Sequence, residues 1–282
     1  MKTLIDGDII VYSCGFSAEK PIWRVMVRGE GKPRATFRYK KELDEWVRSV
    51  GLADTEYDAV KDVEVGPVSH ALGNAKELIK RILLRTGADD YQIYLTGKGN
   101  YREEIATILP YKGNRDSNHK PHHYDALIRY LTENWGAITV EGIEADDAMA
   151  TYQYQAYISG DPVDGWHETV IATIDKDLDM VPGHHYNWNK DVKYTVDEWT
   201  AITWFYVQLI IGDTVDNIQG IKGAGKAKAK KVLMDCDTEE DMYWAVLDLY
   251  CEAYDKPMDA LMENARLLWM RREEGTMWEP PC

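Results

Sequence analysis

The chain has 282 residues and a formal net charge of −15, and 45% of its residues are hydrophobic, which is enough to bury a core as one large domain or two small ones. It contains no run close to the ~20 apolar residues of a membrane span and no basic-then-apolar secretory signal, so we expect a cytoplasmic protein. Its four cysteines show no paired spacing such as C-x-x-C, which indicates reduced thiols and argues against a zinc site built on them.

The predicted elements alternate between strands and helices. Apolar runs, periodicities and turn signals predict strands at Lys2–Ile5, Tyr91–Leu95, residues 137–140 and residues 169–174, the first of them buried, and a β-hairpin at Ile22–Tyr39. They predict amphipathic helices at Lys40–Val50 and Val68–Arg85 and further helices at Tyr124–Trp135 and Glu144–Tyr157, with a polar stretch at Thr96–Pro121. Weak strands are predicted at Tyr186–Trp188 and Lys193–Thr195, and the chain is then helical from Thr200 to about Arg272, with a break at Asp255-Lys256-Pro257. The alternation favours an α/β fold with a central, mainly parallel sheet flanked by helices, and a helical C-terminal part.

Acidic residues occur in four groups, each at or just beyond an apolar run. The groups are Asp6-Gly7-Asp8, Glu144-Ala145-Asp146-Asp147, Asp175-Lys176-Asp177 and Asp213-Thr214-Val215-Asp216. The carboxyl ends of parallel strands lie at one edge of their sheet, so we expect these groups to gather there. Carboxylates brought together in this way repel one another, and divalent cations relieve that repulsion. The pattern therefore points to metal-assisted phosphoryl transfer, although any one group alone also fits a helix cap or a turn.

Two of these groups carry a more local expectation. On extended backbone, Asp175 and Asp177 project to the same side and can flank one ion. If the chain continues as a helix through residue 216, Asp213 and Asp216 lie on one helical face.

A glycine-rich segment comes after the last acidic group. Gly220, Gly223 and Gly225 permit a tight hairpin whose backbone amides approach a phosphate, and lysines are concentrated on the next predicted helix, Lys226–Met234. This predicts a helix–hairpin–helix over residues 212–235 that holds a DNA backbone. The alternative is the phosphate-binding loop of an NTPase, but Ala227 stands where that loop needs a hydroxyl, and no strand directly precedes it.

Basic residues are concentrated in two segments of this acidic chain, Lys98–Lys120 and Lys222–Lys231. Local positive charge of this kind suits a protein that grips phosphates. The alternative for each segment is an ordinary solvated surface.

Four motifs occur in the order found in one known family. They are Asp6 after a strand, Gly142-Ile143-Glu144-Ala145-Asp146-Asp147, Thr173-Ile174-Asp175-Lys176-Asp177, and Gly212-Asp213-x-x-Asp216-Asn217-Ile218-x-Gly220-Ile221-x-Gly223-x-Gly225. Over roughly residues 1–235 the chain thereby resembles the flap-endonuclease/5′–3′ exonuclease superfamily, especially its bacteriophage and bacterial-polymerase-associated members. The resemblance implies a PIN-like nuclease core over residues 1–199 with a helical arch at about 97–121, and a helical part over residues 200–282, packed as one compact unit. Tyr111-Lys112-Gly113-Asn114-Arg115 is similar to the Tyr-Lys-x-x-Arg of the family's arch.

The resemblance also implies an activity and its residues. It implies a 5′–3′ exonuclease and structure-specific flap endonuclease of replication or DNA processing, which hydrolyses DNA with two Mg²⁺ or Mn²⁺ ions, with K⁺ at the helix–hairpin–helix. Lys112 and Arg115 would act on the scissile phosphate. The implied metal ligands are Asp6, Glu144, Asp146, Asp147, Asp175, Asp177, Asp213 and Asp216. The implied DNA contacts are Arg102, Tyr111, Gly220, Lys222, Gly223, Gly225, Lys226 and Lys228. The implied partner is DNA with a free 5′ end or a 5′ flap, and RNA–DNA hybrids are left open. The resemblance also implies a monomer that acts in the cytoplasm of a bacterium or of a phage-infected cell.

The chain departs from the family pattern at two places. The family has an aspartate shortly after the strand predicted at Tyr91–Leu95, and here Thr96-Gly97-Lys98-Gly99 stands instead. Asp8 is an additional acid, and the sequence leaves open whether its side chain compensates. The hairpin at residues 22–39 also intrudes where simpler members continue into a helix. A catalytically impaired helix–hairpin–helix DNA-binding protein is therefore the alternative function, whereas a ribonuclease with a related sheet would lack the segment Gly220–Gly225.

Overall fold

The computed structural model describes residues 1–115, 120–158 and 168–281, so residues 116–119 of the predicted arch lie outside the described residues. The chain forms two compact units. The sheet unit comprises Met1–Ile9, Ile79–His119 and Leu131–Cys282, and the hairpin unit comprises Ile10–Leu78 and Lys120–Tyr130. Residues on both sides of the predicted boundary at 199/200 belong to the sheet unit, because one hydrophobic core joins Leu4 and Ile171 of the sheet to Phe205 and Leu261 of the C-terminal helices.

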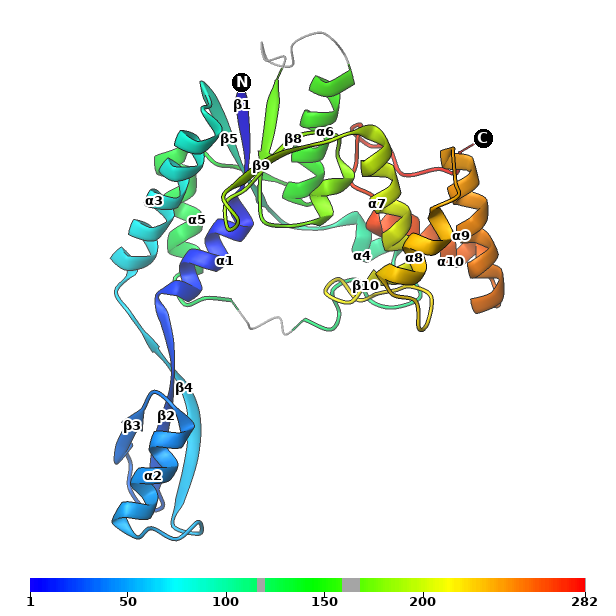
Figure 1. Cartoon of the computed structure of the whole chain (residues 1–282). Coiled ribbons are helices and arrows are strands. Elements are labelled where there is room, and N and C mark those ends of the chain that lie inside the picture. Colours follow the sequence, from blue (N-terminus) through cyan, green and yellow to red (C-terminus); the bar gives the residue numbers. More distant parts are fainter. Residues whose placement is uncertain (116–119, 159–167, 282) are drawn as a thin grey trace. The chain divides into compact units, whose positions relative to one another are not determined.

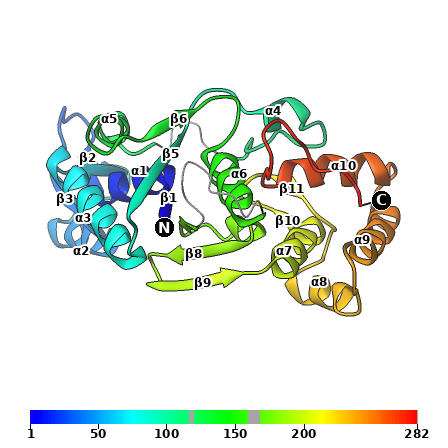
Figure 2. The same cartoon turned by 90° about the horizontal axis from the view of Figure 1, so that it is seen from above.

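A six-stranded sheet organises the sheet unit (Figures 1 and 2). Its order is β6-β5-β1-β7-β8-β9, and every neighbouring pair is parallel except β8 with β9. The strands are β1 (Lys2–Asp6), β5 (Asp90–Thr96), β6 (Ile138–Val140), β7 (Thr169–Ala172), β8 (Gly183–Asn187) and β9 (Val192–Val196). The two central strands β1 and β7 are buried along their whole length, as apolar parallel strands covered on both faces are. The predicted mainly parallel α/β sheet is confirmed.

Helices alternate with the strands as predicted. They are α1 (Gly7–Ser17), α3 (Val68–Thr86), α4 (Tyr101–Ile105), α5 (Tyr124–Trp135), α6 (Ala145–Ile158) and the short 3₁₀ helix η1 (Asp177–Met180). Helix α6 packs against β1, β5 and β7 and so begins beside the carboxyl ends of the central strands. Helix α1 begins directly after β1, and its sequence carries no helical periodicity because apolar residues are spread over all of its faces.

The C-terminal part is helical, as predicted. Helix α7 (Glu198–Ile211) is joined to α8 (Lys226–Leu233) through the two-residue strands β10 (Gly212–Asp213) and β11 (Ile218–Gln219), and α9 (Glu239–Ala253) and α10 (Pro257–Leu268) complete it. The predicted break at residues 255–257 is confirmed, since α9 ends before it and Pro257 opens α10, where a missing backbone N–H costs nothing. Among the described residues, no helix is both long and apolar enough to cross a membrane.

The hairpin unit contains a small antiparallel sheet of order β3-β2-β4. The predicted hairpin is β2 (Glu19–Val27) with β3 (Ala35–Phe37), and the predicted helix α2 (Lys40–Val50) packs on it through Leu43, Val47 and Val25. Strand β4 (Tyr57–Val65) has no clear signal in the sequence, because it is exposed along most of its length and carries several charges. The chain enters and leaves this small sheet side by side, since Gly66 N–H, just after β4, donates to the carbonyl of Ala18, just before β2, at 2.8 Å.

Candidate active site

The acidic groups meet in the sheet unit, at the carboxyl ends of β1 and β7 and the start of α6. Asp6 is the last residue of β1 and is almost fully buried. Its carboxylate accepts hydrogen bonds from Ile9 N–H at 3.0 Å, which caps α1, and from the Thr173 hydroxyl at 2.7 Å. Burial, reinforced by the nearby charges of Asp8 and Asp175, raises the pKa of Asp6 to about 7.

Asp146 lies at the centre of the group. Its carboxylate accepts no hydrogen bond from the residues that the structure describes, although it stands in the first turn of α6. Burial, reinforced by the charges of Asp6, Asp175 and Glu144, raises its pKa well above the usual value. A carboxylate with acidic neighbours and no donor is the group that a bound cation would stabilise most.

The third acidic group differs from its expected geometry. Strand β7 ends at Ala172, and Asp175 accepts a hydrogen bond from Asp177 N–H at 2.9 Å, so residues 175–177 form a turn instead of extended backbone. The two carboxylates nevertheless stay within electrostatic reach. Burial, with Asp175 and Asp213 nearby, raises the pKa of Asp177 to about 7.

The fourth group also differs, because α7 ends before it. Gly212 has φ 70°, and Asp213 then accepts hydrogen bonds from Val215 N–H at 2.7 Å and Asp216 N–H at 3.2 Å. The expectation that Asp213 and Asp216 share a helical face is therefore wrong. Asp213 instead lies 3.7 Å from the Lys176 ammonium, whereas Asp216 faces Glu144.

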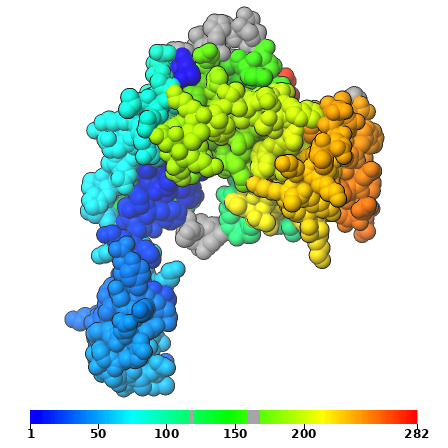
Figure 3. All heavy atoms as spheres, in the orientation of Figure 1, coloured from blue at the N-terminus to red at the C-terminus, as the bar shows by residue number. Residues whose placement is uncertain are grey.

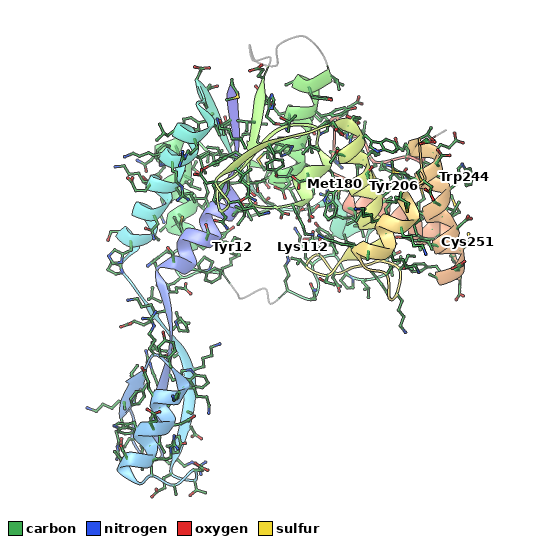
Figure 4. The ribbon with its side chains drawn as sticks, viewed as in Figure 1. Tyr12, Lys112, Met180, Tyr206, Trp244 and Cys251 are labelled. Atoms are coloured by element: carbon green, nitrogen blue, oxygen red, sulfur yellow. The ribbon has the colours of Figure 1, made fainter. Side chains whose placement is uncertain are left out.

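Two cations from the predicted arch reach these acids. The Lys112 ammonium pairs with Glu144 and lies 3.9 Å from Asp216, while Arg115 pairs with Asp216 at 2.5 Å. Figure 4 shows Lys112 projecting from its loop toward the sheet. The backbone is held there, since Lys112 has φ 54° and its N–H donates to the Asp216 carbonyl at 2.9 Å. A phosphate held among the acids would lie within reach of both side chains.

Tyr111 does not present its ring to solvent, contrary to the DNA contact expected of it. The side chain is only 8% exposed, and its hydroxyl lies within hydrogen-bonding distance of both Glu144 and Asp216, at 3.0 and 2.8 Å, so that its one proton bridges the two carboxylates. Tyr111 therefore helps to hold the carboxylates of Glu144 and Asp216 in position.

Arg102 and Asp147 form a buried ion pair with each other. The Arg102 guanidinium binds both oxygens of Asp147, one at 2.8 Å, and also donates to the carbonyls of Leu267 and Trp269 at 2.8 Å. Both side chains are almost wholly inaccessible. The structure therefore corrects two expectations: Arg102 is not available to DNA and Asp147 is not available to a metal, because each satisfies the other and ties α4 and α6 to the C-terminal segment.

The remaining acids suit hard cations by their chemistry. Carboxylate oxygens are the ligands that Mg²⁺ and Mn²⁺ prefer. Across residues 1–115, 120–158 and 168–281, no three His, Cys, Asp or Glu side chains are drawn together tightly enough to coordinate an ion as they stand. The charge of Asp175 raises the pKa values of both Asp6 and Asp146, so these three acids lie within electrostatic reach of one another.

Solved structures share this architecture. The chain matches the bacteriophage T5 D15 protein co-crystallised with metal ions with a TM-score of 0.56 and 17% identity, over 95% of this chain and 88% of that one. It matches the T5 D15 flap endonuclease in a pseudo-enzyme-product complex with DNA and metal ions with the same TM-score and 16% identity, over the same shares. The chain has the 5′-nuclease fold.

Sequence comparison finds similarity to bacterial DNA polymerases. The chain is 35% identical over 118 residues to DNA polymerase I of Rhizobium leguminosarum, which covers 38% of this chain and 11% of the polymerase. It is 27% identical over 235 residues to the thermostable DNA polymerase I of Thermus aquaticus, covering 77% and 27%. The chain thus spans about a quarter or less of the length of these polymerases. No family model matches it. The predicted resemblance to this superfamily is confirmed.

Asp8 supplies a carboxylate near the position where the family pattern lacks one. Gly7 lets α1 start close to β5, since a Cβ there would lie 2.5 Å from the Tyr94 carbonyl oxygen. The Asp8 carboxylate thereby reaches Thr96 N–H, with both oxygens at 3.2 Å. Burial raises its pKa, and the charge of Glu144 adds to the effect. Asp8 therefore places a carboxylate at the end of β5, one residue from Gly97.

The predicted helix–hairpin–helix segment presents its lysines to solvent. Lys222, Lys226 and Lys228 are exposed, with the Lys226 ammonium 4.9 Å from the centre of the Trp204 ring. Gly223 has φ 75°, and Gly225 precedes α8 as its N-cap. Gly220 instead packs inward, since a Cβ there would lie 2.3 Å from Gly212 N. Its part is thus to close the turn between α7 and α8, whereas DNA contact by the other residues stays a prediction.

Proposed function

We propose that this chain is a divalent-metal-dependent nuclease that cleaves DNA phosphodiester bonds at or near a 5′ end. The observation that carries the proposal is the meeting of acids from four distant segments with Lys112 and Arg115 at one sheet edge. The T5 relatives, which were crystallised with metal ions and in one case with DNA, support it. Activity on a 5′ flap, on a plain 5′ end and on RNA–DNA hybrids belongs to the proposal, as does action as a monomer.

Eight carboxylates would hold two Mg²⁺ or Mn²⁺ ions. They are Asp6, Asp8, Glu144, Asp146, Asp175, Asp177, Asp213 and Asp216. Such ions supply a water of lowered pKa and stabilise negative charge on the reacting phosphate. Asp146, which receives no hydrogen bond from the described residues, is the ligand we expect to matter most.

Lys112 and Arg115 would stabilise the charge that builds on the phosphate. Both pair with acids of the site, Lys112 with Glu144 and Arg115 with Asp216, so both side chains already point to where the substrate phosphate would lie. Tyr111 holds the same two acids, so it positions them and does not contact the substrate.

The exposed lysines of the segment between α7 and α8 would bind duplex phosphates away from the cut. Lys222, Lys226 and Lys228 supply the charge, and the turn Gly220–Gly225 is where a K⁺ ion would assist. These contacts carry no sequence information, which suits an enzyme that recognises a DNA end by its shape.

Cleavage of a 5′-labelled duplex with and without a 5′ flap tests the proposal, each with Mg²⁺ and with EDTA. We expect Mg²⁺-dependent release of mononucleotides or of the flap. Loss of a metal ligand in Asp146→Asn should lower the rate by on the order of 100-fold or more, with an unchanged circular-dichroism spectrum. Binding of the duplex with no cleavage in Mg²⁺ or Mn²⁺ would overturn the nuclease assignment in favour of a DNA-binding protein.

A further inference from the structure

A hollow of about 770 Å³ opens on the sheet unit beside the acids. Figure 3 shows all heavy atoms of the described residues, coloured along the sequence. Its walls come from the first turn of α1, the loop after β7, and the β8–β9 hairpin, all within the sheet unit. The volume falls within the range of about 300–1,000 Å³ that is typical of small-molecule sites. Apart from Asp175, no proposed metal ligand or DNA-binding lysine lines it.

One side of the hollow is apolar. Ile9, Ile174 and Val192 line it, and Val192 is 47% exposed on β9. Tyr194 forms part of the same wall and is held in place, because its ring stacks on His185 at 5.3 Å and its hydroxyl donates to Asp179 at 2.7 Å. A fixed apolar wall of this kind suits the flat face of a nucleobase.

Other lining residues offer hydrogen-bond donors and a cation. The Asn187 side-chain oxygen accepts from Asn189 and Lys190 N–H at 3.1 and 3.0 Å, which fixes the turn between β8 and β9. The amide nitrogen of Asn187 makes no hydrogen bond within the described part of the chain, and the Lys190 ammonium forms no ion pair there. Lys176, Asp175 and Asp179 also line the hollow, but Lys176 pairs with Asp177 and Asp213, and the two carboxylates accept hydrogen bonds from Asp177 N–H and the Tyr194 hydroxyl. Among the described lining residues, Lys190 is therefore the charge left for the anionic group of a partly aromatic ligand.

The position of the hollow identifies that ligand. Asp175 lines the hollow and also belongs to the acidic cluster, and Ile9 comes directly after Asp8. A strand whose phosphate lies among the acids would therefore bring its neighbouring nucleotide to this opening. We propose that the hollow binds one unpaired nucleotide of the cleaved strand, with its base against Val192 and its phosphate toward Lys190. This rests on the proposed function. A 5′-nucleotide released by cleavage has the same chemistry and would bind in the same way.

The test uses 2-aminopurine, a fluorescent base, placed at successive positions near the junction of a 5′-flap duplex. Binding is followed in EDTA, where no cleavage occurs. We expect one position whose fluorescence changes on binding, with the change at least halved by Val192→Asp and by Lys190→Glu. Val60→Asp is the matched control, because Val60 is similarly exposed (43%) but lies on β4 of the hairpin unit. Thermal melting of each variant checks its fold.

A response of the same size in Val192→Asp as in the wild type would overturn the proposal, and so would wild-type binding with no position-specific response. Free 2-aminopurine 5′-monophosphate separates the two sources of ligand: a response that Val192→Asp removes identifies the released product, and silence identifies a nucleotide within the strand. Cleavage of the same duplexes in Mg²⁺ is scored separately. If the wild type binds but never cuts, the proposed function fails while the fluorescence result still decides whether the hollow binds a nucleotide.

Discussion

Replacing Asp8 with Asn removes a charge and keeps an oxygen acceptor for the Thr96 N–H. If Asp8 serves only to hold α1 against β5, the Asp8→Asn substitution leaves the metal affinity unchanged. We expect instead that Mn²⁺ affinity, measured by isothermal titration calorimetry, falls by about 10-fold or more, a typical cost of perturbing a metal site. Asp90→Asn is the control, since it removes an equal charge from the far end of β5. Equal affinity in wild type and Asp8→Asn would contradict the assignment.

The Arg102–Asp147 pair leads to a stability prediction. Because both side chains are inaccessible, Arg102→Ala leaves a buried carboxylate without its cation, and we expect a loss of about 3–5 kcal/mol in the free energy of unfolding. Arg85→Ala, which breaks an exposed pair with Asp191, should cost less than about 1 kcal/mol. Urea denaturation of both variants provides the comparison. Similar losses in the two would show that the buried ion pair contributes no more to the free energy of unfolding than the exposed one.

At the scale of elements, the turn between α7 and α8 depends on two glycines that touch. A Cβ on Gly220 would lie 2.3 Å from Gly212 N, whereas a Cβ on Gly225 meets nothing within 4 Å. Gly220→Ala should therefore destabilise the chain by about 1–3 kcal/mol, as overpacking does, and weaken DNA binding by displacing the lysines of α8. Gly225→Ala should cost less than Gly220→Ala, because it meets no steric clash and only exchanges the N-cap residue of α8. Melting curves and a DNA-binding titration on both variants test this, and equal behaviour of the two would refute it.

At the scale of the whole molecule, the acids make stability depend on pH. Asp6 and Asp177 have pKa values raised from 3.8 to about 7, so between these values the folded chain binds more protons than the unfolded chain. Stability without metal therefore decreases as pH rises from about 4 to about 7. We expect the Tm in EDTA to be lower at pH 8 than at pH 5, and Mg²⁺ to raise the Tm more at pH 8. A Tm in EDTA that rises over this range would contradict the electrostatic account.

The sheet and most helices could be predicted from the sequence because apolar runs and helical periodicity depend only on residues close along the chain. Helices α2 and α5 even begin and end where expected. The site could be predicted less evenly. Asp6 and Asp146 lie where their strand and helix ends indicated, but the buried pairing of Arg102 with Asp147 joins residues 45 apart, and no local pattern distinguishes it from a solvent-exposed arginine and a free acid. For the same reason, the sequence did not indicate that Tyr111 is buried against Glu144, or that a turn replaces the helix expected at Asp213.

The reach of Asp8 across to β5 bears on how such enzymes change over evolutionary time. When chains are compared position by position, this one scores as having lost an acid at Gly97, and it could be taken for an inactive relative. In three dimensions the carboxylate of Asp8, on α1, lies beside Thr96, next to that position. If Asp8 binds metal as we propose, a carboxylate can be supplied from a different element than in the family pattern, and Gly7 is the residue that lets α1 come close enough. A survey for vanished catalytic residues should therefore compare positions in space before declaring a loss.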